Sequence, residues 1–339
     1  MLTSQVRVTP DPGTAVVKDD RPAYRPFAVT VARVQQLSPS FVRVTFTGED
    51  LRWFGTDRLD QRVKLVLPRE SDGYLCDVGA KDEQTILDGT WYHQWRELPD
   101  DVRPPFRTYT VRYVRPELAE VDIDLVVHGD AGPASRWVGS AAPGHEAVLV
   151  GPDARSKDST VGIDWSPGTA TELLLAGDET AVPAITSILE TLPADRTARA
   201  FVEVPDSADF LDVDLPEHAT ITWLPRGDRP HGELLVPTVR DWISGNAAMV
   251  GNAFGTGVQE LEDVDIDSEI LWDSPVVRVL PHDMCGRGGE RCGSDFYAWF
   301  AGEAGTIRTL RRLLVSEVGV CRRRVAFMGY WRIGRAEAS

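Results

Sequence analysis

The segment Arg107-Thr108-Tyr109-Thr110 carries side chains that could bind a phosphorylated aromatic ligand. In a strand, alternation puts Arg107 and Tyr109 on one face and the two threonines on the other. A guanidinium binds phosphate in a fork that an ammonium cannot reproduce. A phenol ring can stack on a flat partner, and a hydroxyl can both donate and accept a hydrogen bond. The alternative is that Arg107 and the threonines face water while Tyr109 packs on a neighbouring strand.

A second segment, from His128 to Trp137, reads His-Gly-Asp-Ala-Gly-Pro-Ala-Ser-Arg-Trp. This pattern predicts the end of an apolar strand, a glycine-containing turn and a helix with proline in its first turn. The free N–H groups and small residues of such a helix start let a phosphate approach closely. The residues predicted to lie there are Gly132, Pro133, Ala134 and Ser135. A helix start with ordinary capping is the alternative.

Together the two segments meet the needs of a flavin dinucleotide, FAD. Arg107 and the helix start would hold phosphate, Tyr109 would stack on the flavin, and Thr110 would be the small hydrogen-bond partner of the flavin N5, where hydride arrives. His128 either contacts the flavin or has a structural role. Trp137 is expected in the core, with packing of its ring against the cofactor as the alternative.

Composition limits the classes of protein to which the chain can belong. Its 339 residues can bury two sizeable cores. The net charge of −16 argues against nucleic acid as a partner and against attraction to anionic lipid. No apolar run approaches a membrane span, so no stable membrane insertion is expected. Residues 1–21 lack the pattern of a signal peptide, and we interpret them as a flexible leader on a cytoplasmic protein.

The four cysteines form no CxxC pair, so the sequence offers no framework for a zinc or iron–sulfur site. They are Cys76, Cys285, Cys292 and Cys321. His282, Cys285 and Cys292 share a Gly-rich stretch that could bind a metal or form a disulfide. Reduced thiols in a cytosolic loop are the expected state, and no metal site is predicted.

Residues 22–152 are predicted to form an FAD-binding domain built as an antiparallel β-barrel. Short strand-like runs separated by turn residues are typical of such barrels. A short helix starting near Gly132 interrupts them, and the aromatic run Trp91–Trp95 is either an insertion or part of the core. The predicted strands are Phe27–Val34, Phe41–Phe46, Arg62–Leu67, Arg107–Val114, Val121–His128 and Ala147–Val150.

Residues 153–339 are predicted to form an α/β domain that binds NAD(P)H. Strands alternate with helices there, which indicates a parallel sheet. An irregular excursion near 245–295 contains the acidic stretch Glu260–Asp273, expected to be solvated. The predicted strands are Glu172–Ala176, Ala198–Val204, Thr220–Leu224, Phe296–Ala301 and Arg324–Met328, with helices over Thr180–Leu192, Glu233–Trp242 and Gly302–Val318.

The chain resembles the siderophore-interacting proteins, a family of FAD-dependent ferric-siderophore reductases in the ferredoxin–NADP reductase-like superfamily. The resemblance covers nearly all of the chain after the leader and depends on the order and spacing of six segments. These are Val63–Pro68, Arg107–Thr110, His128–Trp137, Gly177–Ala184, Ala298–Glu303 and Gly329–Gly334.

The resemblance implies a fold of an FAD-binding barrel followed by a nucleotide-binding domain. It also implies that Gly177–Pro183, with Asp178 and Thr180, lies near the adenine side of FAD or the nicotinamide. The sequence has no GxGxxG, and Asp178 with Glu179 would repel a pyrophosphate at that helix start. A carboxylate there can instead cap the helix or accept a hydrogen bond from a ribose hydroxyl.

The region from Glu303 to Arg335 is rich in arginine, which reverses the overall sign of charge. It could hold an anionic partner, or most of its arginines could be solvated. The resemblance implies that basic residues hold an anionic ferric siderophore beside the flavin, and Lys64 and Arg332 stand at matching motif positions. Tyr330 or Trp331 would cover the flavin, with core packing as the alternative.

The expected function is therefore FAD-dependent reduction of ferric siderophores by NADH or NADPH, releasing iron in the cytoplasm. Flavin carries the chemistry, so no protein side chain is assigned a catalytic role. One alternative is a general NAD(P)H:flavin or ferredoxin-type reductase. Another is a non-catalytic cytosolic siderophore-binding protein, which would need no flavin.

Overall fold

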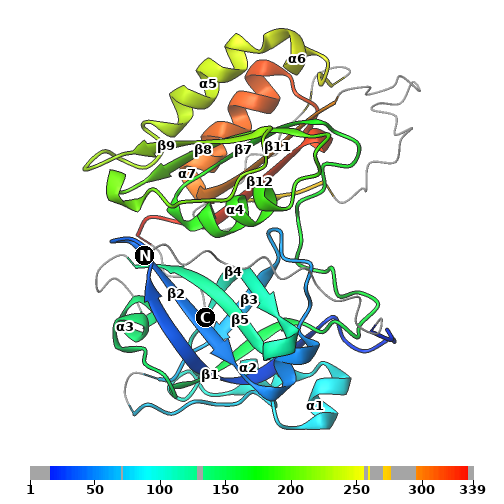
Figure 1. Ribbon diagram of the computed structural model, residues 1–339, viewed down its shortest axis with the longest axis vertical. Coiled ribbons are helices and arrows are strands. Elements are labelled where there is room, and N and C mark those ends of the chain that lie inside the picture. The colour runs from blue at the N-terminus through cyan, green and yellow to red at the C-terminus, as the bar shows by residue number, and fades with distance from the viewer. Residues whose placement is uncertain are drawn as a thin grey trace.

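The chain folds into two bodies, a closed barrel and a layered sheet, which Figure 1 shows one below the other. The computed structural model describes residues 16–69, 72–127, 133–255, 259, 270–275 and 295–334. The barrel strands precede the sheet strands in the chain. The predicted fold class, an antiparallel barrel followed by an α/β sheet, is confirmed.

Six antiparallel strands close the barrel in the order β1-β2-β5-β4-β3-β6. Alternate residues of each strand, such as Phe27, Val29 and Val31, are buried in one interior cluster, which explains the apolar alternation of the sequence. All six strands were predicted. They are β1 (Tyr24–Gln36), β2 (Phe41–Thr47), β3 (Arg62–Val66), β4 (Phe106–Arg115), β5 (Glu120–Val126) and β6 (Glu146–Pro152).

Two short helices between β3 and β4 explain the aromatic run that sequence reasoning could not place. They are α1 (Glu83–Asp88) and α2 (Trp91–Glu97). Trp91 and Trp95 are buried on the outer side of the barrel, where the Trp95 ring lies 4.5 Å from the ring of Phe106. Core packing, the alternative considered above, is therefore the observed role. The predicted barrel helix is α3 (Pro133–Ser140).

The second body is a six-stranded sheet in the order β10-β12-β11-β7-β8-β9. Its strands are parallel except β10, which pairs antiparallel with β12. The predicted parallel strands all form. They are β7 (Glu172–Gly177), β8 (Thr197–Val204), β9 (Ala219–Pro225), β11 (Phe296–Glu303) and β12 (Val325–Trp331), and β10 spans Trp272–Asp273.

Helices cover both faces of this sheet. One face carries α4 (Val182–Glu190), which Figure 1 shows between the sheet and the barrel. The other face carries α5 (Leu235–Gly245) and α7 (Ala304–Arg311), with α6 (Ala247–Gly251) next to α5. A π-helical segment, η5 (Arg312–Val318), continues α7. The short 3-10 turns are η1 (Glu49–Trp53), η2 (Pro116–Leu118), η3 (Glu179–Ala181), η4 (Ser207–Asp209) and η6 (Arg322–Arg324).

The predicted leader differs from expectation at its end. Residues 1–15 lie outside the described residues. Further along, the backbone N–H of Asp19 donates to the Arg155 carbonyl at 2.8 Å, and Lys157 donates to the Asp19 carbonyl at 3.0 Å. The last residues of the leader are thus held against the segment that follows the barrel.

The predicted excursion near 245–295 contains ordered elements, because α6 and β10 both form there. Asp273 ends the acidic stretch and was expected to be solvated. It instead pairs with Arg311 at 2.9 Å and with Arg322 at 3.5 Å. Residues 260–269 of that stretch, and His282, Cys285 and Cys292, lie outside the described residues. Within the part of the chain that the structure describes, Cys76 is a free thiol.

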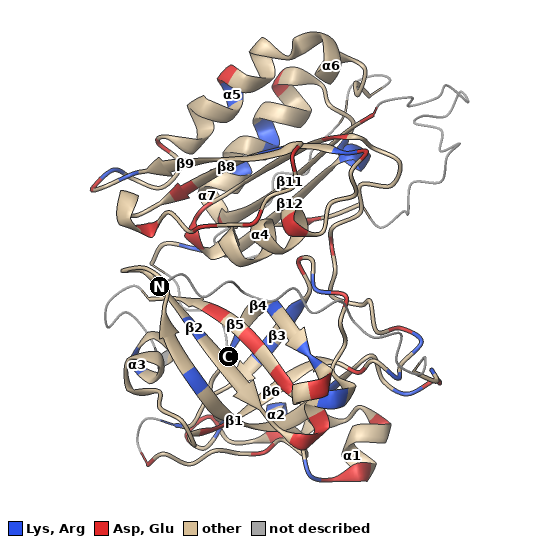
Figure 2. Ribbon diagram, in the orientation of Figure 1, with Lys and Arg blue, Asp and Glu red and all other residues tan. Residues whose placement is uncertain are grey.

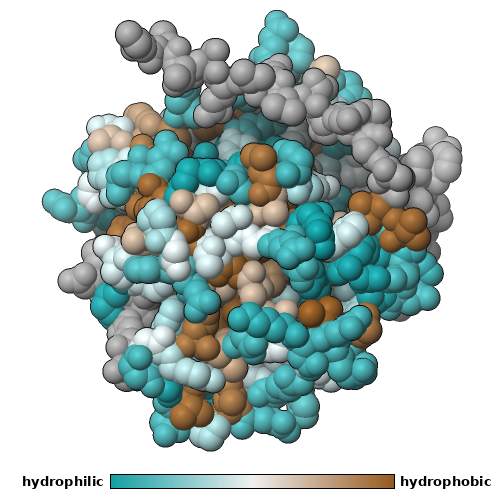
Figure 3. All heavy atoms as spheres, turned by 60° about the horizontal axis from the view of Figure 1, so that its bottom comes forward, coloured by the Kyte–Doolittle hydropathy of each residue, from teal (hydrophilic) through white to brown (hydrophobic). Residues whose placement is uncertain are grey.

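Charged residues of opposite sign stand on neighbouring barrel strands, and Figure 2 shows acidic residues in red along β5. Arg43 meets Asp124 at 2.7 Å, and Arg115 meets Asp122 at 2.6 Å. Figure 3 looks toward the barrel end, where hydrophobic residues are interspersed with hydrophilic ones in the coloured part of the surface. No helix among the described residues is long and apolar enough to cross a membrane.

Candidate functional site

The register of β3 against β4 determines which predicted side chains share a face. Val63 stands opposite Tyr109 and Leu65 opposite Arg107. Both β3 residues are buried in the barrel interior, so Arg107 and Tyr109 project from the same face of the sheet as the core. Tyr109 is half-buried and packs against that core. The predicted alternation is correct, and the stacking of Tyr109 on a flavin stays a prediction.

The opposite face of the same two strands carries Lys64 and the two threonines. Lys64 stands opposite Thr108, and its Nζ lies 3.4 Å from the Thr108 hydroxyl. The same Nζ lies 4.3 Å from the centre of the Phe106 ring, a cation–π distance. Lys64 is therefore a half-buried cation one strand away from the Arg107–Thr110 segment.

Arg107 is half-buried, and its Nη1 donates to the Phe106 carbonyl at 2.7 Å. Among the described residues no carboxylate pairs with it. Most arginines of this acidic chain behave differently; Arg112, for example, binds Glu190 in a fork at 2.5 and 2.8 Å. No carboxylate of the described residues uses the remaining donors of Arg107, and these donors fit a phosphate ligand.

Thr110 connects the barrel to the second body. It is buried, and its hydroxyl is within hydrogen-bonding reach of the Tyr330 hydroxyl from β12. Burial raises the pKa of Tyr330 well above its usual value, with Asp60 and Asp164 acting in the same direction. Tyr330 therefore stays protonated and can donate a hydrogen bond.

Aromatic rings surround Tyr330. Trp272 stacks on it at 5.8 Å with an interplanar angle of 19°, and Trp299 meets it edge-on at 6.3 Å. The guanidinium of Arg62 lies 4.4 Å from the centre of the Trp272 ring. Core packing is thus what the structure shows for Tyr330, and its covering of a flavin stays a prediction.

Asp60 lies beneath this aromatic cluster and joins the two bodies. Its carboxylate accepts hydrogen bonds from the Trp299 indole at 2.9 Å and from the backbone of Asp164 and Trp165 at 3.2 and 3.1 Å. Burial raises the pKa of Asp60 to about 6 despite these donors. The preceding residues, Arg58 and Leu59, both have positive φ (56° and 54°), a conformation that side-chain-bearing residues rarely adopt.

The predicted phosphate-binding turn is described only in part. His128 and Gly132 lie outside the described residues, and Pro133 begins α3. Ala134 and Ser135 are half-buried in the first turn, which contains no acidic residue. Trp137 stacks on Phe46 at 6.2 Å, which confirms its expected place in the core.

Asp178, Thr180 and Trp331 meet at the carboxyl end of the parallel sheet. Asp178 accepts hydrogen bonds from the Thr180 backbone at 2.9 Å and from the Trp331 indole at 2.8 Å. The Trp331 ring also meets His231 edge-on at 4.8 Å. Asp178 thus caps the helix start, one of the two roles considered for it, and contact of all three residues with a cofactor stays a prediction.

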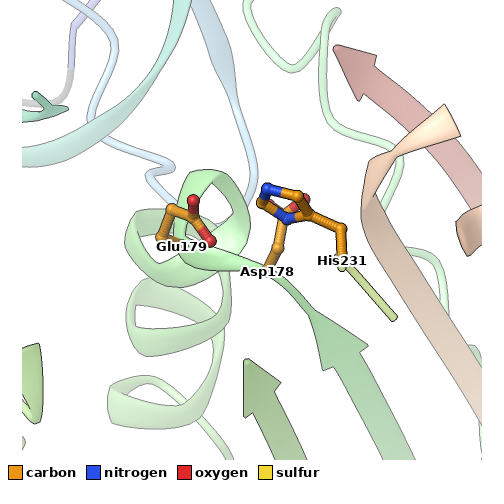
Figure 4. A group of neighbouring side chains, drawn as sticks. All are labelled: Asp178, Glu179 and His231. Carbon is orange, nitrogen blue, oxygen red and sulfur yellow. The ribbon is translucent and has the colours of Figure 1, made fainter. Parts of the chain in front are cut away.

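Asp178, Glu179 and His231 have ligand atoms within 4.8 Å of one another, and Figure 4 shows the imidazole beside the Asp178 carboxylate. Glu179, however, binds Arg226 in a fork at 2.6 and 2.7 Å. Burial, and then Glu179, raise the pKa of Asp178, while burial, and then Arg226, lower the pKa of His231. The donors Thr180 and Trp331 already use the carboxylate of Asp178, and Arg226 uses that of Glu179. A metal ion would need these same oxygens.

Three arginines of the C-terminal region form ion pairs within the second body. Arg311 and Arg322 bind Asp273, and Arg312 meets Glu317 at 3.7 Å. Arg332 is half-buried directly after β12, on the body opposite Lys64. The structure thus places the two predicted substrate residues on different bodies, with Tyr330 and Thr110 at the junction.

Two further carboxylates join the bodies and were missed by sequence reasoning. Glu190, at the end of α4, accepts hydrogen bonds from Arg112 and Arg58 of the barrel. Asp209, in η4, accepts hydrogen bonds from the hydroxyls of Ser38 and Ser40 at 2.7 and 2.9 Å. Asp209 also accepts from the Asp206 backbone in a local capping box, but the barrel partners of both carboxylates lie far away in the sequence.

Glu203 was also missed, although the sequence contained a signal for it. It is a charged residue within the apolar run Ala198–Val204, and it is fully buried. It accepts hydrogen bonds from the backbone of Gly232, Leu234 and Leu235. A carboxylate in a buried strand needs such donors, so its position alone predicts a partner at a helix start.

The barrel residues fit a flavin dinucleotide. Arg107 has donors that no described carboxylate uses, the first turn of α3 contains no acidic residue, and Thr110 offers a hydroxyl at the junction of the two bodies. The turn after β7 differs, because Asp178 and Glu179 place two carboxylates at its helix start. A phosphate therefore fits the barrel side better than the sheet side.

Comparisons with known proteins agree with this division. Residues 30–156 match the model of a siderophore-interacting FAD-binding domain, and residues 170–334 match the model of a siderophore-interacting protein. An uncharacterized protein of Mycobacterium tuberculosis is 36% identical over 204 residues. That match covers 60% of this chain and 66% of the relative, just under two thirds of its length.

A relative with a named activity and a solved structure extend the comparison. The ferric vibriobactin reductase of Vibrio cholerae is 31% identical over 236 residues, which cover 69% of this chain and 79% of that protein. The crystal structure of a siderophore utilization protein from T. fusca has a TM-score of 0.63 and 25% identity, covering 94% of this chain and 97% of that one.

Proposed function

The chain belongs to the siderophore-interacting protein family, and on that premise we propose that it reduces ferric siderophores through FAD with electrons from NADH or NADPH. The observation that carries the proposal is the position of Thr110. It lies three residues after Arg107 in β4 and meets Tyr330 from the second body. A flavin whose ring lay there would be next to both bodies, as a carrier between two substrates requires.

The barrel would hold FAD through Arg107 and the start of α3. Arg107 offers charged donors to phosphate, and Ala134 and Ser135 lie in a first turn without acidic residues. Tyr109 would limit the movement of the ring, and Thr110 would hydrogen-bond to it. When bound, FAD supplies the chemistry of accepting a hydride and passing single electrons to iron.

Lys64 and Arg332 would hold the ferric siderophore. Both are half-buried cations, one on each body, and an anionic chelate needs local positive charge in a protein of net charge −16. Hard oxygen ligands bind Fe(III) more tightly than Fe(II), so reduction would loosen the chelate and release the iron. In this proposal the protein orients and binds, and none of its side chains acts as a general acid or base.

The experiment that tests the proposal traps the ferrous product. Protein loaded with FAD is mixed without oxygen with NADH or NADPH, a panel of ferric siderophores and a coloured Fe(II) chelator. We expect Fe(II) to appear faster than with the same concentration of free FAD. If no ferric chelate exceeds that control while artificial acceptors are reduced, the protein is a general flavin reductase. If it takes up no FAD, the reductase proposal fails, and binding of a ferric siderophore by the apoprotein would then favour a siderophore carrier.

A further inference from the structure

The second sheet has a topological switch point between β7 and β11. From β7 the chain runs outward through β8 to β9, and it then returns to β11, on the other side of β7, and continues to β12. In open α/β sheets a nucleotide binds in the crevice at such a point, with its pyrophosphate on the N–H groups of the first helix. This crevice is therefore the expected place for the phosphates of NADH or NADPH.

The carboxylate of Asp178 occupies this position. It accepts hydrogen bonds from the backbone N–H of Thr180 at 2.9 Å, at the helix start after β7, and of Glu303 at 2.7 Å, at the end of β11. The Thr180 hydroxyl and the Trp331 indole add donors at 2.5 and 2.8 Å. The carboxylate thus makes the contacts that a phosphate oxygen would otherwise make there.

The backbone closes tightly around Asp178. Gly302 has φ of +147°, and a Cβ placed on it would lie 2.7 Å from the carboxylate of Asp178. Only glycine fits at this distance without displacing Asp178. At Gly177 a Cβ would lie 2.5 Å from both Ala181 and the Ala301 carbonyl. The backbone at the base of the crevice is consequently packed closely around the Asp178 side chain.

The neighbouring helix starts are also occupied by the chain's own carboxylates. Glu203 accepts three backbone hydrogen bonds at the approach to α5, and Glu303 caps α7 through the Thr306 N–H at 2.9 Å. Both are buried. The cation beside them, Arg226, is already bound in a fork to Glu179. This edge of the sheet thus presents buried negative charge at the place where a dinucleotide would bring the two negative charges of its pyrophosphate.

We propose that Asp178 excludes the donor's pyrophosphate from this crevice, so that NADH or NADPH reaches the flavin by its nicotinamide end alone. This inference rests on the proposed function. It follows that this edge of the sheet distinguishes neither a dinucleotide from a phosphate-free fragment nor NADH from NADPH, because the groups that differ are not held there.

The first test compares three hydride donors on the FAD-loaded protein. Reduced nicotinamide riboside has the same dihydropyridine ring as NADH but no phosphate. We expect its second-order rate constant for bleaching the flavin to lie within about 10-fold of those of NADH and NADPH, because each 1.4 kcal/mol of phosphate binding would add tenfold. A larger advantage of either dinucleotide would overturn the proposal.

A binding measurement gives a readout independent of turnover. In equilibrium dialysis against the FAD-loaded protein we expect NADP⁺ to show no saturation up to about 1 mM, and a Kd below about 100 μM would contradict the proposal. The proposed function can be tested without any nicotinamide by reducing the bound flavin with light and following its reoxidation by a ferric siderophore. The two hypotheses can therefore fail separately.

The variant Asp178→Ser tests the residue itself. Removal of the carboxylate leaves the N–H groups of Thr180 and Glu303 without an anion, so sulfate should raise the Tm of the variant more than that of the wild type. Asp212→Ser, at an exposed site, is the control. If Asp178→Ser does not fold, Asp178→Asn and the donor comparison on the wild type still decide. An equal effect of sulfate on variant and wild type would show that Asp178 does not occupy an anion position.

Discussion

At the scale of single residues, Arg107 is the most direct test of the cofactor site. We expect Arg107→Ala to weaken FAD binding by about 10- to 100-fold, because a charge-assisted hydrogen bond contributes about 1.5–3 kcal/mol. Fluorescence titration of the apoprotein measures the change. Arg33→Ala removes an exposed arginine that pairs with Glu120 and serves as the control. An FAD affinity equal to that of the wild type would exclude Arg107 from the site.

Lys64 and Arg332 test the substrate site separately from the cofactor. We expect Lys64→Ala and Arg332→Ala to keep FAD and to raise the Kd of an anionic ferric siderophore by about 5- to 20-fold each. Quenching of flavin fluorescence by the chelate gives both constants. Arg229→Ala, at an exposed site on the second body, should change neither. Unchanged chelate affinity in a variant would remove that residue from the site.

Asp60 gives the protein a pH dependence of stability with a definite sign. Its folded-state pKa is raised from 3.8 to about 6, mainly by burial. At a pH between these two values, Asp60 is protonated in the native state and ionised in the unfolded chain. The free energy of unfolding therefore falls as the pH rises from about 4 to about 6. The full effect is on the order of 3 kcal/mol.

The variant Asp60→Asn isolates this effect. The difference in free energy of unfolding between wild type and variant should move in favour of the variant as the pH rises from 4 to 7. Urea unfolding at a series of pH values measures it. A difference that does not change with pH would show that the buried carboxylate does not titrate in this range.

At the scale of elements, α4 and β4 are held together by ion pairs. Burial opposes the ionisation of Glu190, but Arg112 and Arg58 outweigh it and keep its pKa below the usual value. Glu190→Gln should lower the free energy of unfolding by about 1–3 kcal/mol, because two arginines lose their shared anion. Urea unfolding measures this, with Glu49→Gln at an exposed pair as the control. An equal loss of unfolding free energy in Glu190→Gln and Glu49→Gln would mean that the ion pairs between α4 and β4 do not stabilise the protein.

The strands were predictable because burial imposes a visible period. Phe41 to Phe46 alternates since one face of β2 lies in the barrel core, and Leu173 to Ala176 is continuously apolar since β7 is covered on both faces. α1 and α2 were missed. Their helices are short, and their aromatic residues pack on the outside of the barrel rather than along a periodic stripe.

The candidate site was predictable only where its chemistry is local. Arg107, Tyr109 and Thr110 are neighbours in one strand, so their spacing carried the information. Asp60 and Tyr330 meet through contacts between distant segments, and no local pattern encodes such a pair. Asp178 was predictable in part. Two adjacent carboxylates at a helix start already argued against a bound pyrophosphate, but the contacts of Asp178 with Glu303 and Trp331 join distant segments.

At the scale of the whole molecule, described carboxylates of one body bind donors of the other. Asp60 meets Trp299, Glu190 meets Arg112, and Asp209 meets Ser38 and Ser40. These contacts bring β4 next to β12, and with it Thr110 next to Tyr330. The proposed flavin position thus depends on the docking of the two bodies and not on either body alone.

The central claim is that flavin held by this protein passes its electrons to a ferric siderophore. The most direct measurement is a single turnover in an anaerobic stopped-flow instrument, in which FAD-loaded protein reduced by light is mixed with a ferric siderophore. We predict that oxidised-flavin absorbance returns at a rate that saturates with chelate concentration and is slowed at low chelate concentration in Arg332→Ala. A flavin that stays reduced in the presence of every ferric siderophore would contradict the claim.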